Sequence, residues 1–258
     1  LHYARHSSLF ILLTHKYVRL NYSRSQRVIW LLEELNIPFE LKVYLRNKQF
    51  RAPKELENVH PLGKSPVIEV IDTKTGESEV IAETGHIFNY ILSNYDTTNI
   101  LTPANRKLQN QVDYFLHYAE GTLQPNLVAL LVHGFAKQQA PFGTKFLMGL
   151  LVNGIDSMFY IPELKKNLNY LEDIMRKQHE NGSNYFVGDK LSGADIILEF
   201  PVITNIFQNK RGAEQLGAGD VEKEYPHLNQ WAEDIKKEPK YIKAQELVAK
   251  HETVKPNI

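Results

Sequence analysis

Hydrophobic and polar positions change their period along the first hundred residues, and the change predicts a mixed α/β layer. A short strand is expected at 17–20, and the apolar spacing over 28–35 is helical. Positions 39–45 then alternate between apolar and polar side chains, which is typical of a strand with one buried face. A strand, a helix and a second strand in this order predict two parallel strands joined by a crossover helix.

A second pair of strands follows in the same layer. The apolar segments 66–71 and 79–82 flank a turn sequence at 72–77 that is rich in Asp, Thr and Gly. This arrangement predicts an antiparallel hairpin. A helical apolar pattern resumes at Thr84 and closes the layer.

The rest of the chain is patterned as helix. Helices are expected at 107–137, 144–159, 162–181, 194–208, 228–236 and 241–251, several of them opened by a proline in the first turn. The sequence therefore predicts an α/β domain followed by an all-α domain. The predicted residue bounds are 1–15 for an extension outside the fold, 16–97 for the α/β domain, 98–105 for a linker and 106–258 for the helical domain.

Composition narrows the possible chemistry. The formal net charge is zero and no basic stripe is evident, so a nucleic-acid partner is not expected. The chain has no cysteine, which excludes disulfides, thiolate metal ligands and a protein thiol nucleophile. Any sulfur chemistry must use a thiol that arrives with a ligand. The histidines lack metal-ligand spacing, so no metal site is expected.

The strongest candidate site lies around Ser65 and Pro66. Pro66 opens an apolar strand, where its missing N–H is tolerated, and X–Pro is the bond type that becomes cis at modest cost. A cis bond would turn the Ser65 backbone outward, free to pair with an extended peptide. Glu83 and Thr84 add a carboxylate, a hydroxyl and free helix N-terminal amides. These groups predict a receptor for a small peptide that carries an ammonium and carboxylates.

Purely structural interpretations stand beside this one. Pro66 would also suit a trans edge strand, and Glu83 with Thr84 would suit an ordinary helix start. Ser192 and Asp195 read as a capping box, in which each side chain bonds to the other's backbone. We assign that pair to folding and not to ligand binding.

Three motifs together resemble the cytosolic glutathione transferase family. Residues 23–35 look like the first helix of bacterial and fungal members. Residues 61–66 are similar to the family's cis-proline loop, with Glu83-Thr84 as its acidic-hydroxyl pair, and 191–195 resembles its C-terminal capping box.

The resemblance extends over nearly the whole chain, from about Lys16 to Ala249. Segments 50–53 and 114–125 look closest to ascomycete fungal enzymes associated with the endoplasmic reticulum. The resemblance implies a thioredoxin-like N-terminal domain, glutathione as co-substrate and no bound cofactor. It also implies a cytoplasmic homodimer in which the α/β layer of one subunit faces the helices of the other, and peripheral membrane association for the nearest fungal relatives.

The resemblance also implies how glutathione is held. Glu83 would accept a hydrogen bond from the γ-glutamyl ammonium, and the Thr84 hydroxyl and amide would hold that residue's carboxylate. Ser65 would pair with the cysteinyl backbone across the cis bond that follows it. Lys64 and Lys48 would face the glycyl carboxylate.

The group that activates the thiol is expected where the first strand turns into the first helix. Family classes differ in using a tyrosine, a serine or an asparagine there, and this chain offers Asn21, Tyr22 and Ser23. A hydroxyl donor and a helix N-terminus aimed at sulfur both favour the thiolate. Ser23 is the first candidate because it begins the capping sequence, and Tyr22 is the second.

The implied activity is detoxifying thiolate attack on a hydrophobic electrophile, or reduction of organic hydroperoxides by glutathione. The acceptor pocket would be lined by the Tyr114–Tyr118 region, for which core or dimer packing is an equal alternative. Disulfide reduction is disfavoured where it needs a protein cysteine. The rival from another class is a binding or regulatory module that keeps the fold without turnover.

Overall fold

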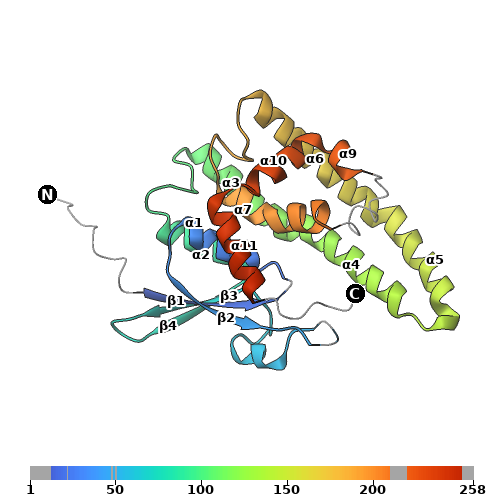
Figure 1. Cartoon of the computed structure of the whole chain (residues 1–258), viewed down its shortest axis with the longest axis horizontal. Helices are drawn as coiled ribbons and strands as arrows, with labels where there is room; N and C mark the ends of the chain where they lie inside the picture. The colour runs from blue at the N-terminus through green and yellow to red at the C-terminus, as the bar shows by residue number, and fades with distance from the viewer. Residues whose placement is uncertain (1–12, 22, 48, 50, 210–219, 252–258) are drawn as a thin grey trace. The chain divides into compact units, whose positions relative to one another are not determined.

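The chain forms two compact units in the computed structural model (Figure 1). The first unit runs to Tyr95 and includes the chain from Pro239 onward, and the second is Asp96–Glu238. The residues that the structure describes are 13–21, 23–47, 49, 51–209 and 220–251.

A four-stranded sheet is the centre of the first unit. Its strands are β1 (Leu13–Leu20), β2 (Phe39–Tyr44), β3 (Val67–Asp72) and β4 (Ser78–Ala82), in the order β2-β1-β3-β4. β1 runs parallel to β2 and antiparallel to β3, and β3 and β4 form an antiparallel hairpin. The predicted crossover pair and the predicted hairpin are both confirmed.

β1 starts earlier than the sequence pattern indicated. Leu13 pairs with Asp72 on β3, and His15 pairs with Phe39 on β2 and is buried. The prediction that residues 1–15 lie outside the fold is therefore wrong for 13–15, and residues 1–12 lie outside the described part of the chain. The error has a physical reason, since ladder pairing is made by the backbone and does not require alternating apolar side chains.

The two faces of the sheet are covered differently. α1 (Gln26–Glu34) and α2 (Thr84–Tyr95) lie together on one face (Figure 1). On the other face the 3-10 helix Lys54–Asn58 brings Leu56 onto Val18 and Val67, which are paired across β1 and β3. Alternation along each strand separates the two sets of side chains.

α11 (Pro239–Lys250), at the end of the chain, belongs to the first unit. The Tyr241 ring meets the Trp30 ring of α1 edge-on at 5.1 Å between centroids, and Lys243 Nζ lies 2.6 Å from Glu33 Oε2. The expected helical domain at 106–258 did not anticipate this return, because the contact links positions about two hundred residues apart and has no local signal.

The second unit is helical, as predicted. Its helices are α3 (Arg106–Tyr118), α4 (Gln124–Gln139), α5 (Lys145–Ile155), α6 (Ile161–Glu180), α7 (Gly193–Leu198), α9 (Val221–Glu224) and α10 (Pro226–Ile235). Three expected helices each contain a π-helical segment, at Ala119–Leu123, Asp156–Tyr160 and Glu199–Phe207. Within the described residues, no helix is long and apolar enough to span a bilayer.

The Asp195 carboxylate links three parts of the helical core. Its Oδ2 accepts hydrogen bonds from Ser192 N–H at 3.0 Å and Ser192 Oγ at 2.9 Å, which confirms the capping box at the start of α7. Its Oδ1 accepts from Phe186 N–H at 2.9 Å and from Trp231 Nε1 of α10 at 3.1 Å. The residue is fully buried, and burial raises the pKa of Asp195 to about 6.

We expect Asp195→Ala to lower the free energy of unfolding by about 3 kcal/mol or more, because buried donors lose their acceptor and α7 loses its cap. Urea unfolding measures this change. The matched control is Asp173→Ala, which removes an exposed carboxylate paired with Arg176 and Lys177 and should leave the midpoint nearly unchanged. Equal losses in the two variants would contradict the assignment.

His15 generates a second prediction. Its ring nitrogens are buried, and this burial lowers the pKa of His15 below 6.5, although a contact with the Pro38 backbone acts in the opposite direction. As the pH falls, His15 is therefore protonated in the unfolded chain before it is protonated in the folded protein. The stability that neutral His15 contributes is present above pH 6.5 and is lost as the pH falls below that value. His15→Phe removes the titrating group and keeps an aromatic ring against Tyr95.

The stability of the native protein minus that of His15→Phe should accordingly decrease as the pH is lowered from about 7 to about 5. Denaturant unfolding at several pH values measures the difference, in which the titration of all other groups cancels. A difference independent of pH would show that His15 does not titrate in this way.

Candidate functional site

Ser65 joins the start of β3 to the end of β1. The Ser65–Pro66 peptide bond is cis, as the sequence predicted. Ser65 Oγ accepts a hydrogen bond from Leu20 N–H at 3.0 Å and donates one to Val18 C=O at 3.1 Å. Among the described residues, neither the Ser65 N–H nor its C=O has a hydrogen-bond partner. These two backbone groups are available to an extended ligand.

The loop before Ser65 depends on a glycine. Gly63 has φ of 55°, and its N–H donates to His60 C=O at 2.8 Å. A Cβ at this position would lie 2.9 Å from Glu57 Cγ, so both the backbone conformation and the close approach favour glycine. Lys64, the next residue, is exposed.

The N-terminus of α2 lies beside this loop. Glu83 has a left-handed backbone with φ of 68°, which is uncommon for a residue with a side chain, and its C=O accepts the first helical hydrogen bond from Ile87 N–H. Its side chain is exposed, whereas Thr84 is buried. The first N–H groups of a helix have no intrahelical acceptor, so this end of α2 favours an anion.

The turn after β1 is held by serine hydroxyls. Ser23 Oγ donates to Leu20 C=O at 2.6 Å and lies 2.7 Å from Ser25 Oγ, and it accepts from Ser25 N–H at 3.3 Å. The Tyr17 hydroxyl donates to Ser25 C=O from beneath the turn. A serine has one hydroxyl proton, and Ser23 donates it to Leu20 C=O.

Asn21 has an unused donor. Its Oδ1 accepts from Arg46 N–H at 2.7 Å, and its backbone C=O accepts from Arg46 Nε at 3.1 Å. Because a backbone N–H requires an acceptor, the oxygen of the amide is fixed in this direction. The Asn21 Nδ2 then has no partner among the described residues. Burial lowers the pKa of Arg46.

Sequence reasoning missed Arg46. Arg46 follows the alternating strand at 39–45 and belongs to no motif, so the sequence gives no signal for its role. The parallel pairing of Leu20 with Tyr44 brings Arg46 to Asn21. Of the other site predictions, Tyr22 and Lys48 lie outside the described residues.

Strand register gathers the remaining candidates at one end of the sheet. Val67 pairs with Val18 on one side and with Ala82 on the other. The segment after β1, the Ser65–Pro66 bond before β3 and the Glu83–Thr84 pair after β4 are thus neighbours. The arrangement combines free backbone groups, a helix N-terminus, an exposed carboxylate and amide donors, which suits a short peptide with charged ends.

The aromatic residues of α3 divide between core and surface. Phe115 and Tyr118 are buried in the helical unit, where the Tyr118 hydroxyl donates to Asn167 Oδ1 at 2.7 Å. Tyr114 stacks on Tyr118 and is 47% exposed. For Phe115 and Tyr118 the packing interpretation therefore holds, and Tyr114 alone of the three is exposed. No cluster of three metal-ligating side chains occurs in the described part of the chain.

Comparison with known proteins gives the same classification for both units. Residues 23–92 match the glutathione S-transferase N-terminal domain, and residues 155–244 match the C-terminal domain. The chain is 35% identical over 228 residues to glutathione S-transferase 1 of Saccharomyces cerevisiae, covering 88% of this chain and 92% of the relative. Glutathione S-transferase 3 of Schizosaccharomyces pombe is 30% identical, covering 71% of each protein. The chain therefore belongs to the glutathione S-transferase family.

Solved structures agree with the fold. A glutathione S-transferase from Actinobacillus pleuropneumoniae is 28% identical with a TM-score of 0.67, covering 92% of this chain and 93% of that one. A glutathione transferase homologue from Lodderomyces elongisporus, solved with two glutathione molecules per subunit, is 20% identical with a TM-score of 0.68, covering 91% and 98%. The predicted α/β and all-α architecture of this family is confirmed.

Proposed function

We propose that this protein is a glutathione transferase that directs the glutathione thiolate onto hydrophobic electrophiles, with reduction of organic hydroperoxides as a second activity. The observation that carries the proposal is the meeting of Ser65, Glu83, Thr84 and Asn21 at one end of the sheet. A polypeptide without cysteine needs a thiol from its ligand, and glutathione supplies one.

Glutathione would lie along this end of the sheet. Its cysteinyl backbone pairs with the free N–H and C=O of Ser65, and its γ-glutamyl carboxylate is held by Thr84 at the positive end of α2. Glu83 accepts from the γ-glutamyl ammonium, and Lys64, with Lys48, faces the glycyl carboxylate. The glutathione-bound structural relative from L. elongisporus supports this ligand.

Glu83→Gln and Thr84→Val should each weaken glutathione binding about tenfold or more, since each removes a charge-assisted or buried hydrogen bond. Calorimetric titration of the full chain measures the affinity. Glu79→Gln is the matched control, because Glu79 is an exposed carboxylate on β4 of the same sheet and should have no effect. Unchanged affinity in both site variants would refute the binding mode.

Asn21 is the proposed activator of the thiol. Ser23 was the first candidate from sequence, but its proton is used by Leu20 C=O, whereas Asn21 Nδ2 has no partner among the described residues. The Arg46 guanidinium, which bonds the Asn21 backbone, adds positive charge that favours a thiolate. Tyr22 remains the alternative donor.

Asn21→Asp should lower kcat/KM with chloro-dinitrobenzene at least about tenfold, because the new carboxylate keeps the acceptor for Arg46 N–H and repels the thiolate. Ser23→Ala should lower kcat/KM less than about threefold while reducing stability, since it removes a buried hydrogen bond. Tyr22→Phe tests the alternative hydroxyl donor in the same assay. A severe loss in Ser23→Ala together with normal thiolate absorbance in Asn21→Asp would reverse the assignment.

The acceptor site, the assembly and the cellular location complete the proposal. Exposed Tyr114 is the proposed aromatic contact for a hydrophobic acceptor, and the protein is proposed to be a cytoplasmic homodimer on the strength of its family. Association with the endoplasmic reticulum rests on the resemblance to fungal members. The rival regulatory module predicts glutathione binding without turnover of any electrophile or of cumene hydroperoxide.

A further inference from the structure

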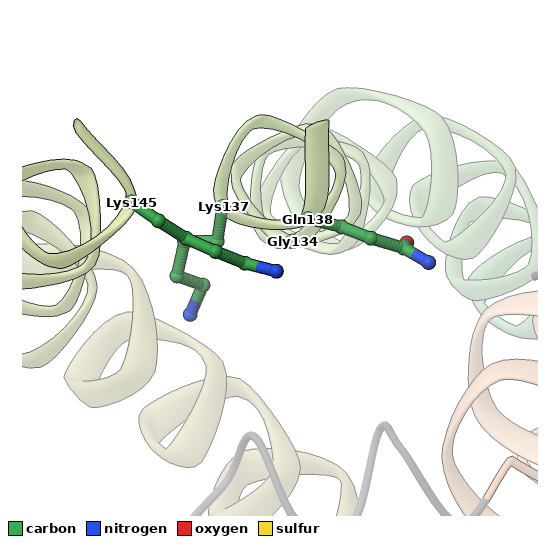
Figure 2. A pocket seen from close by; sticks show the side chains of 4 residues that line it. All are labelled: Gly134, Lys137, Gln138 and Lys145. Carbon is green, nitrogen blue, oxygen red and sulfur yellow. The ribbon is translucent and has the colours of Figure 1, made fainter. Parts of the chain in front are cut away.

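Ionisable side chains also come together in the helical unit. One place is an open hollow of about 310 Å³ on α4 and α5, lined by Gly134, Lys137, Gln138 and Lys145. Figure 2 shows the two lysine side chains reaching into the same space, while Gln138 points away from them. Lys137 Nζ donates to Asn153 Oδ1 at 3.0 Å and lies 3.8 Å from Asp156 Oδ2, so part of this positive charge is balanced within the fold. Another place is the contact between α6 and α10, where two histidines meet.

The rings of His179 and His227 face each other through the same kind of nitrogen. His179 lies in the last turn of α6, and His227 lies in the first turn of α10. Their Nδ1 atoms are 2.9 Å apart, and the ring centroids are 5.1 Å apart. The centroid separation exceeds the Nδ1 separation by nearly the radii of both rings, so the two nitrogens point at each other. This is the geometry of a hydrogen bond and not that of two ligands directed at a common metal ion.

This contact requires a single hydrogen between the two nitrogens. In a neutral imidazole one nitrogen carries the hydrogen and the other accepts, so one Nδ1 must donate while the other accepts. The Nε2 of His179 is buried and has no hydrogen-bond partner among the described residues. A hydrogen on that atom would be a buried donor without an acceptor. We therefore assign the bridging hydrogen to His179 Nδ1 and the acceptor role to His227 Nδ1.

A further proton has no favourable position in this pair. On His179 Nε2 it would be a buried N–H without an acceptor. On His227 Nδ1 it would replace the accepting lone pair, and two N–H groups would face each other at 2.9 Å. Exchange of the donor and acceptor roles also places a hydrogen on His179 Nε2. The closed contact therefore disfavours the protonated pair.

The charged groups around the pair act in both directions. Burial and the neighbouring His227 lower the pKa of His179, whereas Asp234 of α10 and Glu172 of α6 act to raise it. Glu172 also accepts from the backbone N–H groups of His227 at 3.0 Å and Leu228 at 2.8 Å. Other ionisable side chains on α6, α9, α10 and the neighbouring segments have partners of their own: Asp234 with Lys237, Lys223 with Asp220, Glu199 with Thr204, Tyr185 with Glu238, and Arg176 with Asp173 and Glu180.

We propose that His179 and His227 form a pH-sensitive clasp, which holds the first turn of α10 on α6 while the pair is neutral and opens when the pair takes up a further proton. Glu172 remains as a second attachment, because it binds two backbone N–H groups of that turn. Trp231, one turn beyond His227, donates to Asp195 at the start of α7, so opening would loosen the helical core at α10 first. The inference is independent of the glutathione chemistry proposed above.

The direction of the pH effect follows from the burial of His179. Because its pKa is lowered in the folded protein, the closed clasp is fully present above pH 6.5 and is lost as the pH falls below that value. Asp195 acts on stability in the opposite direction. Burial raises the pKa of Asp195 to about 6, so the folded protein takes up that proton before the unfolded chain does. Variants of the clasp in which Asp195 is unchanged separate the two effects.

Long-range proton–nitrogen NMR correlation spectra of the histidine rings test the pairing directly. At about pH 7, His179 should carry its hydrogen on Nδ1 and His227 should carry its hydrogen on Nε2, and at about pH 5 both rings should be cationic. Any other placement of the two hydrogens at about pH 7 would overturn the proposal.

Amide hydrogen exchange of the full chain measures the opening. After correction for the intrinsic exchange rate, exchange of the α10 amides should rise at least about threefold between about pH 7 and about pH 5. His227→Gln and His179→Phe should each make this exchange nearly independent of pH, because no bridge remains to be broken. His179→Phe keeps an aromatic ring beside His227, which guards against a folding defect in the first variant.

His117→Gln is the matched control, because His117 is an exposed histidine of α3 that pairs with Asp113. It should show the same pH response as the native protein. A response that persists in both clasp variants would belong to Asp195 and would contradict the proposal. Exchange of α10 that does not change with pH in the native protein would contradict it as well.

Discussion

The end of β1 is the point on which the proposed site depends. β1 lies between β2 and β3, and its backbone pairing runs to Leu20 on the β2 side and to Val18 on the β3 side. Ser65 Oγ adds hydrogen bonds to Val18 C=O and Leu20 N–H, while Leu20 C=O holds the Ser23 hydroxyl. A shift of one residue in this register would reverse the side chains and separate the loop, the turn and the start of α2.

The helical unit uses buried carboxylates in a similar way. Asp195 ties α7, the preceding loop and α10 to one another through four hydrogen bonds. Asp156, buried in the π-helical segment that follows α5, has its Oδ1 2.6 Å from His133 Nδ1 of α4. This second contact holds the segment between α5 and α6 against α4.

Local signals in the sequence predicted much of the fold. Periodicity identified the crossover pair, the hairpin and the helical second half, and the Ser65–Pro66 bond and the capping box at Ser192 were predicted because they depend on near neighbours. Long-range features were not predicted: the start of β1 at Leu13, the packing of α11 on α1 and the contact of Arg46 with Asn21. Each joins segments that no local pattern relates.

The same limit applies to the site. Sequence order placed Asn21, Tyr22 and Ser23 where the first strand turns into the first helix, but residue type could not show which side-chain donor is free. The hydrogen bonds distinguish Ser23 from Asn21. Ser23 donates its proton to Leu20 C=O, whereas Asn21 Nδ2 has no partner among the described residues. The sequence predicted a helix at 144–159 but did not indicate which of its apolar residues are buried, and the structure leaves Phe146, Leu147, Leu150 and Leu151 exposed.

A structure of this protein with glutathione bound tests the central claim most directly. The account predicts the γ-glutamyl carboxylate at the Thr84 N–H, the cysteinyl backbone paired with Ser65 and the sulfur within hydrogen-bond reach of Asn21 Nδ2. Glutathione bound away from this end of the sheet, or bound there with its sulfur on the Ser23 hydroxyl, would contradict it.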